Sequence, residues 1–126
     1  MKMVFYVAIG GALGSTARYL TAEAFSRWIG TGFPWATLTV NIVGSACMGL
    51  LAGLMAHVWS LPTEMRLFLT TGILGGFTTF STFSLDVASM LQRGDFSTAA
   101  AYMLSSLVIG IGGLFAGLYL VRMVTA

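Results

Sequence analysis

The stretch GGFTTFSTFS, residues 75–84, lies inside the third long apolar segment of the chain and interrupts it with glycines, hydroxyl residues and phenylalanines. A run of leucine would serve a purely apolar helix better. Gly75 and Gly76 allow the helix to break near the middle of this segment, and we expect the break between Gly75 and Thr78. Unwound backbone surrounded by apolar material persists only where protein buries it or a cavity hydrates it. We therefore expect a specialised site here, with main-chain carbonyls that could coordinate a cation.

Composition places the surrounding chain in a membrane. Of its 126 residues, 57% are hydrophobic and 8% are charged, and the mean hydropathy is +0.91. Soluble domains carry roughly 25% charged residues. The length predicts one domain, 1–126. The net charge of +2 comes without a basic cluster, so we expect no nucleic-acid partner, and the single Cys47 excludes an internal disulfide.

Four apolar segments are each long enough for the ~20 helical residues that cross a bilayer. They run over 3–25, 35–58, 67–90 and 98–124, and glycines and prolines gather between them. We predict an all-α membrane protein with four transmembrane helices, the third of them broken. Glycines four residues apart predict close helix packing; they are Gly10 and Gly14, Gly49 and Gly53, Gly72 and Gly76, and Gly113 and Gly117.

The positive charges are balanced across the predicted bundle. Four spans put both termini on one side, here called side A, and the opposite side is called side B. Each side receives three Lys or Arg residues: Lys2, Arg66 and Arg122 on side A, and Arg27, Arg93 and the nearby Arg18 on side B. A fixed orientation normally has an excess of positive charge on one side. The balance predicts insertion in both orientations, with an antiparallel homodimer if the chain self-associates; a weakly biased single orientation is the alternative.

Polar residues from all four spans lie in one layer, roughly 6–15 Å from side B at ~1.5 Å per helical residue. Such residues usually face the bundle interior or a water-filled cavity. The layer is rich in hydrogen-bond donors and poor in carboxylates, which favours an anion pathway. It contains Arg18, Asn41, Thr79, Ser81, Thr82, Ser84, Tyr102, Ser105 and Ser106, with Asp86 as the nearby acid.

Each polar group could instead be satisfied separately. Arg18 could extend to the side B surface, Tyr102 could be an interfacial anchor, and Asn41 and Ser106 could form interhelical hydrogen bonds. Asp86 could simply pair with Arg18 or Arg93.

Three phenylalanines follow at helical spacing. Phe77, Phe80 and Phe83 would form one stripe on a helix, and their positive ring edges could receive an anion without holding it tightly. A phenylalanine stripe is also an ordinary packing pattern.

GGFTTFSTFS, with TLTVNIVG in the second span, GGALGSTARY in the first and TAAAYMLSS in the fourth, resembles the Fluc (CrcB) family of small fluoride channels over essentially the whole chain. The resemblance implies a multi-pass protein of the bacterial inner or plasma membrane. It implies an antiparallel, dual-topology homodimer with two fluoride pores between the subunits. Passive outflow of cytoplasmic fluoride would then protect the cell.

The resemblance also assigns roles to residues. Phe80 and Phe83 would line the pores with their ring edges, and Asn41 would be the pore asparagine. Tyr102 and Ser106 would form a polar track whose next position is Gly110 here. Around them, Arg18, Thr79, Ser81, Thr82 and Asp86 complete the expected pore set. The main-chain carbonyls of Gly75 and Thr78 from each subunit would hold a structural sodium ion at the dimer centre.

Other classes fit the sequence less well. A small multidrug antiporter would need a carboxylate within the first span, whereas Glu23 lies near the end of that span. An intramembrane enzyme would need a nucleophile, a base or a metal cluster, and a lone His57 and Cys47 do not supply one. A proton-coupled fluoride transporter would need a proton relay, and no obvious one is present. We therefore predict a channel that is not an enzyme.

Overall fold

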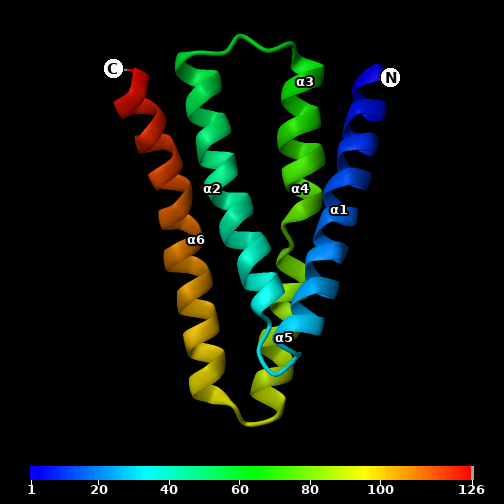
Figure 1. The fold of residues 1–126 in the computed structure, drawn as a ribbon, viewed down its shortest axis with the longest axis vertical. Helices are drawn as coiled ribbons and strands as arrows, with labels where there is room; N and C mark the ends of the chain where they lie inside the picture. Colours follow the sequence, from blue (N-terminus) through cyan, green and yellow to red (C-terminus); the bar gives the residue numbers. More distant parts are fainter. Residues whose placement is uncertain (126) are drawn as a thin grey trace.

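The computed structural model describes residues 1–125, which form four helical stretches that alternate in direction, with both termini at side A (Figure 1). Three stretches are continuous helices: α1 (Lys2–Trp28), α2 (Trp35–His57) and α6 (Phe96–Thr125). The other stretch is divided into α3 (Thr63–Leu67), η1 (Phe68–Leu74), α4 (Gly75–Phe77) and α5 (Phe80–Gln92). Within the described residues the fold is all-helical, as predicted, and its four stretches match the predicted segments closely.

Glycines in the left-handed region of backbone space end two of the helices. Gly30 follows α1 with φ 92°, and Gly94 follows α5 with φ 80°. Glycine adopts this conformation without the steric penalty that other residues meet. The side B connections therefore fall where the helix breakers predicted them.

The third stretch is broken, but the break lies at Thr78 and Thr79 rather than at the glycines. Thr78 (φ −85°, ψ 158°) and Thr79 (φ −151°, ψ 122°) are extended, whereas Gly75 is helical (φ −63°, ψ −37°). Gly76 serves close packing instead, because a Cβ there would lie 2.7 Å from the Gly11 carbonyl oxygen of α1. The break expected between Gly75 and Thr78 therefore begins at the last residue of that range and extends to Thr79, while Gly75 stays helical.

Two further features of this stretch differ from the sequence prediction. Phe77 precedes the break and Phe80 follows it, so the three phenylalanines do not share one helical stripe. The segment η1 is a π-helix, and the sequence pattern predicted an ordinary α-helix there. Single π-turns within α-helices are often found next to functional sites.

The helices pack as two close pairs. α1 packs on η1 and α4, and α2 packs on α6, which runs in the same direction. A Cβ on Gly10 would lie 2.9 Å from the Gly72 Cα, and one on Gly117 would lie 2.6 Å from the Ala46 carbonyl oxygen. These separations confirm close backbone approach for most of the predicted glycines, whereas a Cβ on Gly113 would make only an ordinary contact, 3.7 Å from the Ala46 Cβ.

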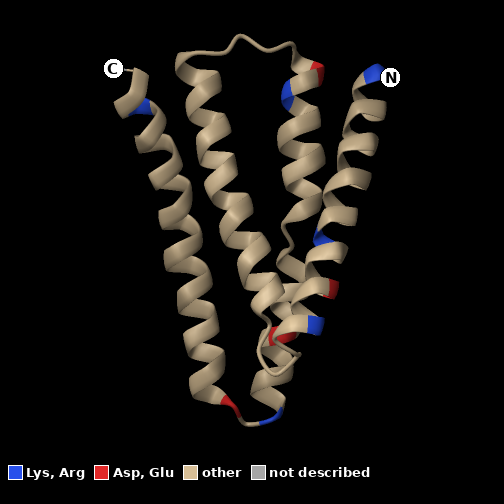
Figure 2. Cartoon of the chain, in the orientation of Figure 1, with Lys and Arg blue, Asp and Glu red and all other residues tan. Residues whose placement is uncertain are grey.

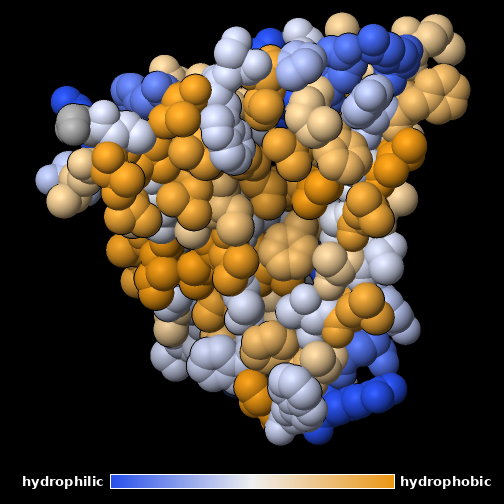
Figure 3. All heavy atoms as spheres, turned by 45° about the horizontal axis from the view of Figure 1, so that its top comes forward, coloured by the Kyte–Doolittle hydropathy of each residue, from blue (hydrophilic) through white to orange (hydrophobic). Residues whose placement is uncertain are grey.

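The enclosed core of one chain is small and lies toward side B. Its fully buried cluster is Met90, Ala99 and Tyr102. By contrast, large apolar side chains are exposed along the outer faces of α1 and α6. Figure 3 shows them as a hydrophobic band between more polar ends. Such a band fits lipid or another protein chain better than water.

Two of the described helices, α2 and α6, are long and apolar enough to cross a membrane. α1 has 27 residues and carries charged side chains at both of its ends. Figure 2 shows Lys and Arg at both ends of the bundle, in line with the balanced charge count. At side A, Lys2 and Glu64 form an ion pair of 2.8 Å, and this hydrogen bond lowers the pKa of Glu64 and raises that of Lys2.

Substituting Gly117 tests the role of glycine in helix packing. Gly117→Ala forces a methyl group against the α2 backbone, and overpacking of this kind costs about 1–3 kcal/mol. We expect a lower Tm in thermal unfolding and a less uniform elution profile from size-exclusion chromatography. Gly112→Ala on the same helix is the matched control, because a Cβ there meets no atom within 4 Å. Equal Tm values for the two variants would contradict the packing role.

Candidate functional site

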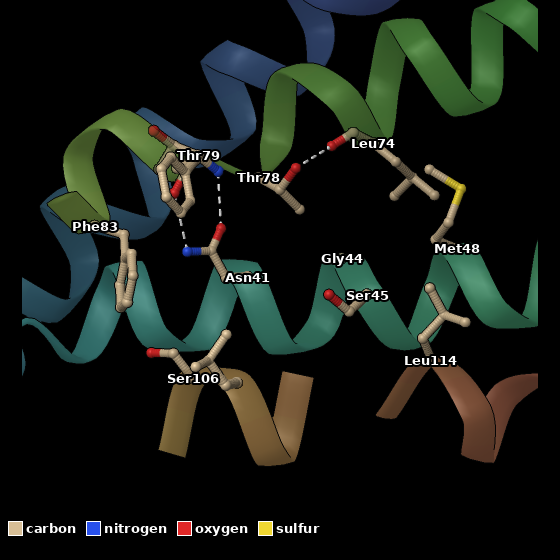
Figure 4. Close-up of a pocket in the computed structure, with 12 residues that line it drawn as sticks. Asn41, Gly44, Ser45, Met48, Leu74, Thr78, Thr79, Phe83, Ser106 and Leu114 are labelled. Carbon is tan, nitrogen blue, oxygen red and sulfur yellow. Dashed lines mark hydrogen bonds between the residues drawn. The ribbon is translucent and has the colours of Figure 1, made fainter. Parts of the chain in front are cut away.

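Asn41 bonds to both main-chain polar groups of Thr79, the second residue of the helix break. From α2, its Nδ2 donates to the Thr79 carbonyl oxygen at 3.0 Å, and its Oδ1 accepts from the Thr79 main-chain N–H at 2.8 Å. Figure 4 shows both bonds side by side. One carboxamide therefore satisfies the donor and the acceptor of an extended residue that has no helical partners. The second Nδ2 N–H of Asn41 is left for another acceptor.

The break removes the usual partners of two main-chain carbonyls. In a continuous helix, the Gly75 carbonyl would accept from the Thr79 N–H, four residues on, but that N–H donates to Asn41. The Thr78 carbonyl would accept from the Thr82 N–H, which instead donates to the Thr79 side chain at 3.2 Å as the N-cap of α5. Gly75 is also exposed in the single chain. These two carbonyls are the ones expected to coordinate a cation.

Arg18 is fixed to the same segment from the other side. Its Nε donates to the Gly76 carbonyl oxygen at 3.1 Å, so the side chain points toward the break rather than toward the side B surface. A positive charge is thus placed beside the broken helix at membrane depth. Surface-directed extension of Arg18, the alternative drawn from the sequence, is contradicted by this contact.

Tyr102 and Asp86 form a pair that the sequence did not predict. The Tyr102 hydroxyl donates to Asp86 Oδ2 at 2.9 Å, and Tyr102 is fully buried. Its ring packs against Phe33 and Phe83, with ring centroids 5.5 Å and 5.1 Å away. Burial rules out an interfacial anchor.

The expected ion pairs of Asp86 are absent from the described residues. Arg18 bonds to a main-chain carbonyl instead, and Arg93 pairs with Asp95 at 3.3 Å. The prediction that Asp86 pairs with Arg18 or Arg93 was wrong, because the closer tyrosine hydroxyl takes up the carboxylate.

A cavity of about 300 Å³ lies beside the break, between α2, α5 and α6 (Figure 4). It brings together five of the predicted pore residues, Asn41, Thr79, Phe80, Phe83 and Ser106, and it is also lined by Thr78 of the predicted cation site. The Phe80 and Phe83 ring centroids are 5.8 Å apart, and Phe80 is 77% exposed. Ser106 Oγ is buried and has no hydrogen-bond partner within the described chain. No Asp or Glu lines this cavity.

The other predicted residues lie around different spaces. Arg18, Thr79 and Thr82 line a second cavity, of about 320 Å³, against α1. Asp86 lines a third near the side B surface. Ser81 is exposed, with its Oγ 3.4 Å from Thr79 Oγ1, and Tyr102 lies in the core cluster. The polar residues that were predicted to form one layer thus lie in several separate cavities, in the core cluster and on the surface around the break.

Sequence reasoning missed one polar residue in the cavity beside the break, Ser45. It lies four residues after Asn41 on α2 and lines the same space. The i, i+4 spacing could have identified it, since such residues share one helix face.

The chemistry of this cavity suits a small anion. Asn41 and Ser106 supply uncommitted N–H and O–H donors, and the two phenylalanines supply ring edges. Among the described residues, no group of three or more His, Cys, Asp or Glu could hold a metal ion.

Comparison with known proteins agrees with this chemistry. The family model described as CrcB-like protein, Camphor Resistance (CrcB), matches residues 5–118. The chain belongs to the CrcB family. A relative from Rhodospirillum centenum named "Fluoride-specific ion channel FluC" is 57% identical over 126 residues, covering all of both chains.

Two more CrcB family relatives carry the same name. The one from Nitrobacter winogradskyi is 52% identical and covers 98% of this chain and all of its own. The one from Agrobacterium fabrum is 55% identical and covers 97% of this chain and 98% of its own. Membership of this family and the apolar helices establish a membrane protein.

Proposed function

We propose that this chain is a fluoride-selective channel that lets cytoplasmic fluoride leave the cell by passive flow. The carrying observation is the cavity beside the break, which joins uncommitted donors to two phenylalanine rings and has no carboxylate lining it. The relatives named as fluoride-specific ion channels support fluoride as the anion. Passive outflow through the inner or plasma membrane would confer resistance to fluoride.

The cavity would replace part of the fluoride hydration shell. Fluoride is small and strongly hydrated, so a pore must offer donors for the water that the ion loses. The free N–H of Asn41 and the O–H of Ser106 are suitable donors, and the edges of Phe80 and Phe83 add a weaker attraction. Weak contacts from several groups allow the ion to leave, which conduction requires.

A second, oppositely oriented copy would complete each pore. Phe80, which lines the cavity, is exposed on the outside of the single chain, and the exposed Gly75 has a carbonyl whose helical donor is used elsewhere. Lipid cannot satisfy such a carbonyl. A partner chain could cover it, and the three-against-three charge balance supports an antiparallel, dual-topology homodimer with two pores at its interface.

A sodium ion would fit the dimer centre. The Gly75 and Thr78 carbonyls lose their helical donors at the break, so each chain offers two neutral oxygens that need a positive partner. Two copies would offer four. A small monovalent cation suits neutral oxygens, whereas divalent ions usually recruit carboxylates. When bound, sodium would supply charge that links the subunits and would take no part in fluoride transfer.

The rival classes have less support. An antiporter or a proton-coupled transporter would need an acidic group that exchanges protons along the pathway, and the acid nearest the cavity, Asp86, accepts a hydrogen bond from buried Tyr102. The relatives are named as ion channels rather than as enzymes.

Fluoride release from liposomes tests the proposed function. We expect purified protein to release fluoride rapidly, measured with an ion-selective electrode, and to release chloride far more slowly. Phe80→Ile and Phe83→Ile keep an apolar side chain but remove the positive ring edge, so each should reduce fluoride flux strongly while elution on size-exclusion chromatography is unchanged. Absence of fluoride-selective release by the unmodified protein, or full flux in both variants, would contradict the proposal.

Replacing sodium tests the central cation site. Protein purified and reconstituted with N-methylglucamine in place of sodium should lose most of its fluoride flux, because the four carbonyls would lack a charge partner. Adding sodium back should restore the flux, and adding the same concentration of N-methylglucamine chloride is the control. Full activity after sodium removal is verified by elemental analysis would show that the site is not required.

A further inference from the structure

The cavity beside the break is polar at one end and apolar at the other. Asn41, Thr79 and Ser106 lie at the polar end, and Met48, Leu74 and Leu114 lie at the other end, toward side A. A fluoride ion that passes from one end to the other would leave its donors behind. Moving an ion into apolar surroundings without a hydrogen bond is costly, so the apolar end needs a donor of its own.

Ser45 is placed to supply that donor. It lies one helical turn after Asn41 on the same face of α2 and lines the cavity between the two ends (Figure 4). Four helical residues correspond to about 6 Å along the helix axis. Ser45 therefore places a hydroxyl one helical turn farther toward side A than Asn41, the donor on this helix that was identified from the sequence.

The Ser45 hydroxyl is not used by its own helix. Hydroxyls within helices often donate to the carbonyl four residues earlier, and Thr16, Thr70 and Ser84 do so here at 2.6, 2.7 and 2.9 Å. Ser45 makes no hydrogen bond to any described residue, and neither does Ser106. Both O–H groups are thus free to donate to a ligand in the cavity.

The neighbouring helix has no side chain at this level. One turn after Ser106, α6 carries the buried Gly110, and the only nearby heavy atom that a Cβ there would meet is Ser45 Oγ, at 3.9 Å. This distance is an ordinary van der Waals contact. The hydroxyl next to Ser106 along the cavity therefore comes from α2, across a gap left by Gly110.

We propose that Ser45 is a fluoride-binding residue, donating a hydrogen bond to the ion one turn beyond Asn41 and Ser106. This inference rests on the proposed fluoride channel. It assigns the donor in the part of the pathway toward side A to α2. It also explains why glycine is accommodated at position 110, because Ser45 on the facing helix already supplies a donor opposite it.

Removal and relocation of the hydroxyl test this role. Ser45→Ala should reduce fluoride flux from liposomes by roughly tenfold, as expected for one hydrogen bond to a charged group. Adding Gly110→Ser to Ser45→Ala should restore most of the flux, because the new hydroxyl would point into the same gap. Adding Gly110→Ala instead should restore none, although it fills the same space. Thr16→Val, which removes a hydroxyl already bonded within α1, should leave the flux unchanged.

The outcomes separate this inference from the proposed function. If the unmodified protein releases fluoride selectively and Ser45→Ala releases it equally fast, Ser45 is not a binding residue although the channel function stands. Equal recovery with serine and alanine at position 110 would show that Ser45 acts through packing, which also overturns the inference. If Ser45→Ala does not elute as the unmodified protein does, Ser45→Cys keeps the shape with a weaker donor, and full flux in that variant would contradict the proposal.

Discussion

Two hydrogen bonds between the Asn41 carboxamide and the main chain of Thr79 are the interaction on which the site depends. An extended segment within the apolar part of a bundle is stable only if its N–H and C=O groups find partners. A single side chain from α2 supplies one donor and one acceptor together. Because Thr79 is bonded to Asn41, it is held in position to cap α5 with its own hydroxyl.

The same interaction determines which groups remain free. The Thr79 N–H donates to Asn41 and the Thr82 N–H donates to the Thr79 side chain, which leaves the Gly75 and Thr78 carbonyls without their helical donors. One amide N–H of Asn41 stays free on the cavity side. Unpaired acceptors and an unpaired donor thus lie close together at one short segment, where the acceptors would bind a cation and the donor an anion in the proposed channel.

The remaining packing keeps this segment at a fixed place in the bundle. Arg18 reaches from α1 to the Gly76 carbonyl, and Gly76 lies too close to Gly11 to carry a side chain. The α2–α6 pair is held together by similar contacts at Gly49 and Gly117. Asn41 then links the two helix pairs across the break, so the cavity forms where they meet.

Much of the fold could be predicted from the sequence because it follows from hydropathy and from the positions of helix breakers. The four helical stretches and the packing glycines are of this kind. The exact break could not be predicted, since glycine at 75 and 76 is compatible with a helix and with a break alike. The deciding partner, Asn41, is 38 residues away from Thr79.

The residues of the site were predicted only in part, because the sequence gives the depth of a residue along its helix but not its neighbours on other helices. Depth along each helix identified Asn41, Phe80, Phe83 and Ser106, which share a cavity. Depth alone carries no information about which face a residue occupies, so Arg18 and Asp86, which line other spaces, were placed in the same layer. Ser45 was missed for the same reason, because the helix face that it shares with Asn41, four residues earlier, was not considered.

Amide hydrogen exchange at Thr79 tests the central claim most directly. Asn41→Leu keeps the branched shape of the side chain but removes both hydrogen bonds, so the Thr79 amide should exchange about tenfold faster or more, given the cost of unsatisfied main-chain groups. Asn41→Asp retains an acceptor for the Thr79 N–H and should give an intermediate rate, while exchange in the middle of α6 stays the same in all three proteins. An unchanged rate at Thr79 in the leucine variant would contradict the account.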